Sequence, residues 1–150
     1  MLFSACAASI TNIHYTPQPS RIANPAADVK LLIQANTVAN CTTTPEVQSL
    51  LIVVQSTCTG QEDSVEIVEN RPYVTTGSAV VRLDHVESIK LQKSGVWFGM
   101  FVHHNNGAND FVWTSKSLED MERLADAITA LAKPPPSPHN IVPARALSEP

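Results

Sequence analysis

The segment 117–132 constrains the fold most, because its apolar residues repeat with the period of an α-helix. Five apolar residues share one face of this helix: Leu118, Met121, Ala125, Ile128 and Ala132. Ser117 stands at the N-cap position, and Lys133-Pro134 ends the pattern. A helix of this length is marginal in water by itself. Its apolar stripe must therefore pack against the strands that the preceding sequence predicts.

Runs of β-branched and apolar residues before this helix predict an antiparallel sheet. The predicted strands cover residues 49–57, 65–69, 79–83, 88–92, 96–104 and 110–115. The turn-forming Asn105-Asn106-Gly107-Ala108 joins the last two strands into a hairpin. We therefore expect an α+β fold in which a sheet of about five to six strands carries an N-terminal helix and a closing C-terminal helix.

The N-terminal helix is predicted over residues 25–37, because Asn24 can cap it and Pro25 suits its first position. Val29, Leu31 and Ile33 also alternate as they would in a strand, so a strand remains the alternative. The polar stretch 41–45 is interpreted as a break between elements.

Composition divides the chain into three parts. Residues 1–24 are interpreted as an anchor or signal remnant followed by a flexible linker, and 25–133 as a single α+β domain. Residues 134–150 are predicted to be a Pro-rich disordered tail. An apolar content of 43% is sufficient for one core.

Charge argues against nucleic acid as a partner. The formal net charge is −4, and the Lys and Arg residues are scattered singly along the chain. The longest apolar run, residues 50–54, is far too short to cross a bilayer. We therefore expect contact with a membrane only through an anchor.

Such an anchor is suggested by Phe3-Ser4-Ala5-Cys6, which resembles the lipobox of bacterial lipoproteins. The resemblance implies that Cys6 is acylated and tethers the protein in the cell envelope on the periplasmic side. Phe3 stands where the family usually has Leu, and the basic start of a signal peptide is missing. A cytoplasmic protein with an incidental cysteine is the alternative.

With Cys6 acylated, the other two cysteines, Cys41 and Cys58, form an even pair in an oxidising compartment. A disulfide between them would contribute about 3 kcal/mol in the chain-entropy model. The cytoplasmic alternative predicts two free thiols instead.

Over residues 50–132 the order of elements resembles a pleckstrin-homology-like module. The resemblance implies a bent antiparallel sheet capped by the C-terminal helix, in a family that binds phosphoinositides, peptides or proteins. The early loop, residues 59–64, holds Glu62 and Asp63 and no basic residue, so phosphoinositide binding is not expected. A generic antiparallel sheet with two packed helices is the alternative.

No motif points to a metal, a cofactor or a catalytic residue. His103 and His104 are adjacent in a strand, so their side chains point to opposite faces and do not meet at one ion. We expect His103 to face Asp110 across the hairpin and His104 to face Asn109. Neither a nucleophile elbow nor a phosphate-binding glycine loop occurs.

The hairpin predicts one apolar face on each side. Five residues are expected under the C-terminal helix: Phe98, Met100, Val102, Phe111 and Trp113. The opposite face is expected to carry Trp97, Phe101 and Val112. Either another part of the fold covers this second face, or it is a groove for a partner strand, a peptide or an acyl chain.

These expectations favour a non-enzymatic, envelope-associated lipoprotein domain that binds a protein, another envelope component or a ligand. A cytosolic adaptor of pleckstrin-homology type that binds a peptide or protein is the alternative.

Overall fold

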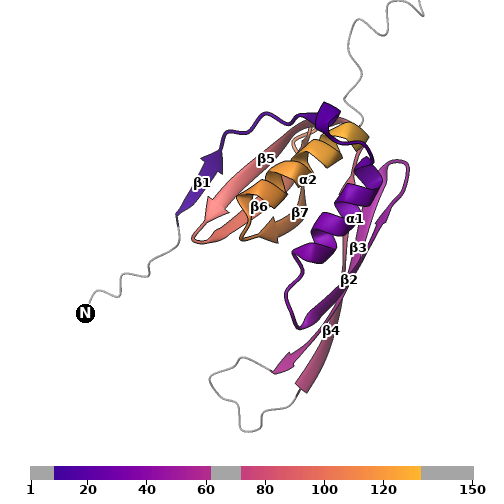
Figure 1. Cartoon of the computed structure of the whole chain (residues 1–150), viewed down its shortest axis with the longest axis vertical. Helices are drawn as coiled ribbons and strands as arrows, with labels where there is room; N and C mark the ends of the chain where they lie inside the picture. Colours follow the sequence, from indigo (N-terminus) through magenta and orange to yellow (C-terminus); the bar gives the residue numbers. More distant parts are fainter. Residues whose placement is uncertain (1–8, 62–71, 133–150) are drawn as a thin grey trace, which may run out of the picture.

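The computed structural model describes residues 9–61 and 72–132 (Figure 1). Within these ranges the chain forms two α-helices and seven strands, which make two antiparallel sheets. The predicted α+β class is therefore confirmed. Cys6 with its lipobox, the strand expected at 65–69 and the Pro-rich tail lie outside the described residues.

The two sheets are built from consecutive parts of the chain, apart from the first strand. The first sheet has the order β1-β5-β6-β7, with bounds β1 (Ile10–Ile13), β5 (Val86–Ser94), β6 (Trp97–His104) and β7 (Asn109–Ser115). The second has the order β2-β3-β4, with bounds β2 (Cys41–Val47), β3 (Leu51–Gln61) and β4 (Pro72–Arg82). A 3-10 turn, η1 (Pro19–Arg21), precedes the first helix.

Both helices lie on the same side of the sheets and pack against each other (Figure 1). Helix α1 (Pro25–Ala35) contacts β2, and α2 (Leu118–Leu131) contacts β5, β6 and β7. Asn24 caps α1 by accepting a hydrogen bond from the Ala27 amide, and Ser117 caps α2 in the same way from Asp120. The helical interpretation of residues 25–37 is thus confirmed, with the helix ending at Ala35.

One core joins the helices to both sheets. Met121 and Ile128 of α2 are 1% and 0% exposed, as the apolar stripe predicts. Val29 and Ile33 of α1 are also fully buried. The strands contribute further large buried side chains: Ile52, Val54, Val81, Met100, Val102 and Val112. Leu83, directly after β4, is also fully buried.

Residues 10–24, expected to be a flexible linker, are part of this fold. Strand β1 pairs with β5, and the segment after β1 is attached to α2. The Tyr15 hydroxyl and the Gln18 amide both donate to Asp126 Oδ1, over 2.7 and 2.6 Å. The sequence signal was weak because these partners are more than a hundred residues apart.

Strand β2 replaces the break expected at 41–45. Its three consecutive threonines are β-branched and suit a strand, although they are polar. Thr43 and Pro45 are buried, and Thr44 between them is exposed. Pro45 is tolerated because β2 is at the edge of its sheet.

Candidate functional site

A β-bulge in β7 decides which side chains of the β6–β7 hairpin face outward. Met100 is paired with Trp113 and Phe101 with Phe111, so Val112 is an extra residue on β7. Val112 is fully buried, whereas Phe111 is 42% exposed. The expectation that Val112 shares a face with Trp97 and Phe101 is therefore wrong, and Phe111 takes that place. Uninterrupted alternation was assumed, and the bulge breaks it.

The end of the hairpin also differs from the expected register by one residue. The Gly107 amide donates to His104 O, and Gly107 has φ of +89°. His104 consequently pairs with Ala108, and His103 lies opposite Asn109 rather than Asp110. His103 Nδ1 is 2.7 Å from the Asn109 side-chain oxygen.

The residues Trp97, Phe101 and Phe111 form what we call the aromatic face. Their neighbours on β6, Met100 and Val102, are fully buried, so the aromatic face is on the side of the sheet away from the helices. The rings of Phe101 and Phe111 pack edge to face with centroids 5.6 Å apart. Trp97 is 39% exposed, so large aromatic surface stays open among the residues that the structure describes.

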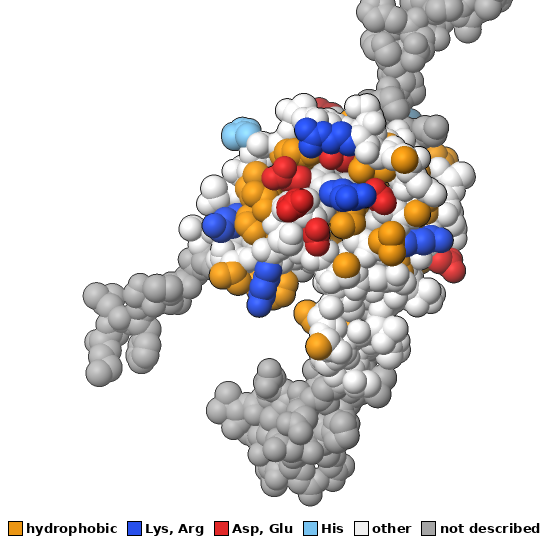
Figure 2. All heavy atoms as spheres, in the orientation of Figure 1, with side chains coloured by type: hydrophobic (Ala, Val, Ile, Leu, Met, Phe, Trp, Pro, Cys, Tyr) orange, Lys and Arg blue, Asp and Glu red, His pale blue; other side chains and the backbone are white. Residues whose placement is uncertain are grey.

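Two lysine side chains lie beside the aromatic face. The Lys116 ammonium is 4.9 Å from the centre of the Trp97 ring, within cation–π distance. Lys90 is exposed and lies directly opposite Phe101 in the β5–β6 ladder. On the helical side, by contrast, acidic and basic side chains are interspersed (Figure 2). The aromatic face therefore suits a partner with apolar groups and negative charge.

A polar cluster joins the two sheets at the start of β7. Asp110 Oδ2 accepts hydrogen bonds from the Arg82 amide and from His104 Nε2, each over 2.9 Å. Burial raises the pKa of Asp110, but these two hydrogen bonds and the nearby positive charges outweigh it and lower the pKa below its ordinary value.

Both ring nitrogens of His104 make contacts within this cluster. The residue is 2% exposed, and its Nδ1 is 2.9 Å from the carbonyl oxygen of Asp84. Both ring nitrogens thus lie within hydrogen-bond distance of oxygen atoms. The cluster connects β6 and β7 with the end of β4, which is a structural task for these residues.

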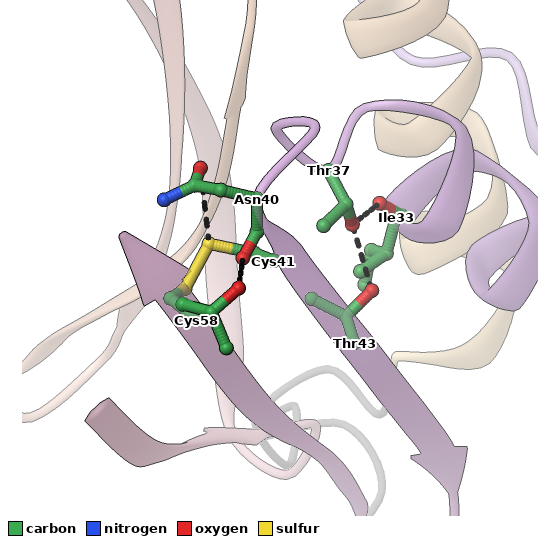
Figure 3. Close-up of a disulfide and its surroundings, with 7 residues drawn as sticks. Ile33, Thr37, Asn40, Cys41, Thr43 and Cys58 are labelled. Carbon is green, nitrogen blue, oxygen red and sulfur yellow. Dashed lines mark hydrogen bonds between the residues drawn. A yellow bond between two sulfur atoms is a disulfide. The ribbon is translucent and has the colours of Figure 1, made fainter. Parts of the chain in front are cut away.

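The predicted disulfide between Cys41 and Cys58 is present (Figure 3). The two residues are directly opposite each other in the β2–β3 ladder. The adjacent pair, Asn40 and Thr59, is joined by a backbone hydrogen bond, so the cysteines occupy a non-hydrogen-bonded position, where side chains are closest. Nearby, the Thr37 hydroxyl donates to Ile33 O and accepts from Thr43, linking α1 to β2 (Figure 3).

The disulfide lines a small cavity between the two sheets. The cavity has a volume of about 170 Å³, and Trp97 and Trp113 also line it. Trp113 also donates its indole hydrogen to Asn36 O at the end of α1. Ligand sites usually exceed ~300 Å³, so this cavity does not suit a sizeable small molecule.

A larger groove of about 500 Å³ lies where the N-terminal segment crosses the start of β5 and the end of α2. Tyr15, Pro17 and Ile89 contribute apolar surface, and Glu87 and Thr129 contribute polar groups. Burial and the hydrogen bond to Asp126 raise the pKa of Tyr15 to about 12, so its hydroxyl stays protonated at neutral pH. Sequence patterns did not point to this groove.

Within residues 9–61 and 72–132, no three side chains of the metal-binding types are grouped for an ion. In the same part of the chain, no helix has the length and hydropathy needed to span a membrane. No protein-family model matches the chain, and neither a curated protein nor a solved structure has significant similarity to it.

Proposed function

We propose that this protein is a non-enzymatic, envelope-associated lipoprotein domain that binds another protein through the aromatic face. The observation that carries the proposal is the open aromatic surface of Trp97 and Phe111 on the side of the sheet away from both helices. Aromatic residues are enriched where protein interfaces gain most of their binding energy, because a rigid ring buries a large area at little entropic cost.

The disulfide supports the compartment in this proposal. Cys41 and Cys58 are bonded, and structural disulfides persist in oxidising compartments such as the periplasm. Acylation of Cys6 would hold the domain at the membrane surface there. The two lysines beside the aromatic face favour a partner segment that carries carboxylates beside its apolar side chains.

Site-specific photo-crosslinking in the native host tests the binding face. A benzophenone amino acid replaces Phe111 in one variant and Glu119, which is exposed on α2, in the control variant. We expect a crosslinked protein only from position 111, and we expect Phe101→Ser to abolish it. Equal crosslinking from both positions, or none from position 111, would refute the proposed face.

Mass spectrometry of the natively expressed protein tests the anchor separately. We expect a lipid-modified Cys6 at the N-terminus of the mature chain, and a Cys6→Ser variant that leaves the membrane fraction. An unmodified Cys6 in the mature protein would refute the lipoprotein assignment and leave the binding face to be judged by crosslinking.

The second candidate function is a cytosolic adaptor of pleckstrin-homology type. What favours it is the order of elements, in which two antiparallel sheets precede a C-terminal helix that packs across one of them. This candidate predicts free Cys41 and Cys58 thiols in living cells, whereas the lipoprotein predicts a disulfide. Thiol trapping with a maleimide at the moment of lysis distinguishes the two.

A further inference from the structure

The two sheets have four edge strands, and three of these are protected against pairing with other chains. Strand β1 has only four residues. Strand β7 is interrupted by the bulge at Val112. Strand β2 carries Glu46 and Pro45. Asn40 and every second residue after it form the hydrogen bonds to β3, so the backbone of Pro45 faces the free edge. Proline has no N–H to donate there.

Between Thr76 and Val81, strand β4 has none of these features, and β7 approaches it at Arg82. Strand β4 has eleven residues and pairs with β3 without a register shift. From Thr76 to Val81 it contains no charge and no proline. Together with β3 it extends well beyond the helices (Figure 1).

The alternation of hydrogen bonds along β4 shows which of its backbone groups face the open edge. The Leu83 amide donates to Leu50 O on the β3 side, whereas the Arg82 amide donates to the Asp110 side chain on the opposite side. Because residues in a strand alternate between the two sides, the amides and carbonyls of Thr76, Ser78 and Val80 face the open edge. Among the described residues these groups have no backbone partner on that side.

We propose that this edge of β4 pairs antiparallel with β4 of a second copy of the chain, centred on Ser78. In this two-fold arrangement Ser78 lies opposite Ser78 of the other copy, and Thr76 lies opposite Val80. The residues whose backbone groups face the edge thereby bond to one another, and the second sheet becomes continuous across both copies.

The sequence of the edge favours a second copy over an unrelated strand. A two-fold axis brings each residue near its own counterpart, so any charge in the segment would meet a like charge. Residues 76–81 carry none. Ser78 has a small hydroxyl at the axis, and the next bonded pair, Thr76 with Val80, is β-branched and suits cross-strand pairing. Arg82, the first charged residue, has its amide already bonded to Asp110 and marks the end of the ladder.

The dimer is independent of the proposed function, because the aromatic face and Cys6 take no part in it. Sedimentation velocity of the full chain, from micromolar to millimolar concentrations, should show a reversible monomer–dimer equilibrium. A wild-type protein that stays monomeric over this range would overturn the inference.

Three variants locate the interface. Ser78→Pro removes an amide on the open edge and no bond to β3, so it should weaken dimerisation about tenfold or more. Ser78→Lys should do the same by placing two like charges at the axis. Gln55→Lys is the matched control, because Gln55 is exposed beside Ser78 on β3 but away from the seam.

Circular dichroism and thermal unfolding of the monomers check that the variants keep their fold, and Ser78→Lys remains informative if Ser78→Pro does not fold. Dimerisation of both Ser78 variants with the wild-type affinity would refute the interface. Equal weakening by Gln55→Lys and Ser78→Lys would also refute it, since a charge away from the seam would then act as strongly as one at it.

Discussion

At the scale of single residues, one additional residue in a strand changed the identity of the candidate site. The expected alternation places the side chain of Val112 on the outward face, yet it is fully buried. Phe111, expected in the core, is open to solvent. The bulge adds one residue to β7, and no local sequence pattern marks it. Only the pairing of β7 with β6 reveals it.

Asp110 supports a prediction about pH. Its folded-state pKa is lowered, so its ionisation stabilises the fold above the ordinary aspartate pKa of about 3.9, and this contribution is lost as the pH falls through the folded-state pKa. Asp110→Asn should lower the free energy of unfolding at neutral pH by about 1–3 kcal/mol. It should also flatten the loss of stability between neutral pH and the acid range.

Urea unfolding at a series of pH values measures both effects. Glu119→Gln is the control, because Glu119 is exposed on α2 and makes no described ion pair or hydrogen bond. An Asp110→Asn variant with the same pH slope as the wild type would contradict the assigned role of this carboxylate.

At the scale of elements, the N-terminal segment is a strap rather than a linker. Strand β1 extends the first sheet, and the chain then crosses α2, where Asp126 binds it at two points. Asp126 is 3% exposed in a helix whose other buried residues are apolar, which is an unusual position for a carboxylate. Its two hydrogen bonds explain this burial, since buried polar groups are normally paired.

Asp126→Ala should therefore release the strap. The variant leaves the Tyr15 hydroxyl and the Gln18 amide without their acceptor, and we expect a loss of stability of about 2 kcal/mol. Hydrogen exchange followed by mass spectrometry should show faster exchange at Gln18 and in β1, with α1 unchanged.

Tyr15→Phe is a graded control, because it removes one of the two bonds and leaves the Gln18 amide bonded. It should have a smaller effect on exchange than Asp126→Ala. Unchanged protection of Gln18 in Asp126→Ala would mean that Asp126 does not hold the strap.

At the scale of the whole molecule, two sheets that diverge along their length are held together by one core and one polar cluster. Both helices contribute to the core, and Asp110 joins β4 to β7 where the sheets meet. The second sheet extends away from this junction (Figure 1). The disulfide crosslinks its strands β2 and β3. The extended part of the second sheet packs less against the core, so we expect the crosslink to contribute more to its local stability.

Removal of the disulfide tests this description. The double variant Cys41→Ser, Cys58→Ser should be less stable than the oxidised wild type by about 3 kcal/mol, because the crosslink restricts the unfolded chain. Guanidinium unfolding followed by tryptophan fluorescence and by circular dichroism measures the difference. The reduced wild type is the control and should match the double variant.

Local patterns in the sequence determined the α+β class, both helices with their caps, the hairpin and the cysteine pair, because each depends on residues close together or on a simple count. The bulge at Val112, the strap held by Asp126, the strand at Cys41–Val47 and the open edge of β4 were decided by tertiary structure. Each of these depends on a partner far along the chain, and the periodicity of a single segment carries no information about that partner.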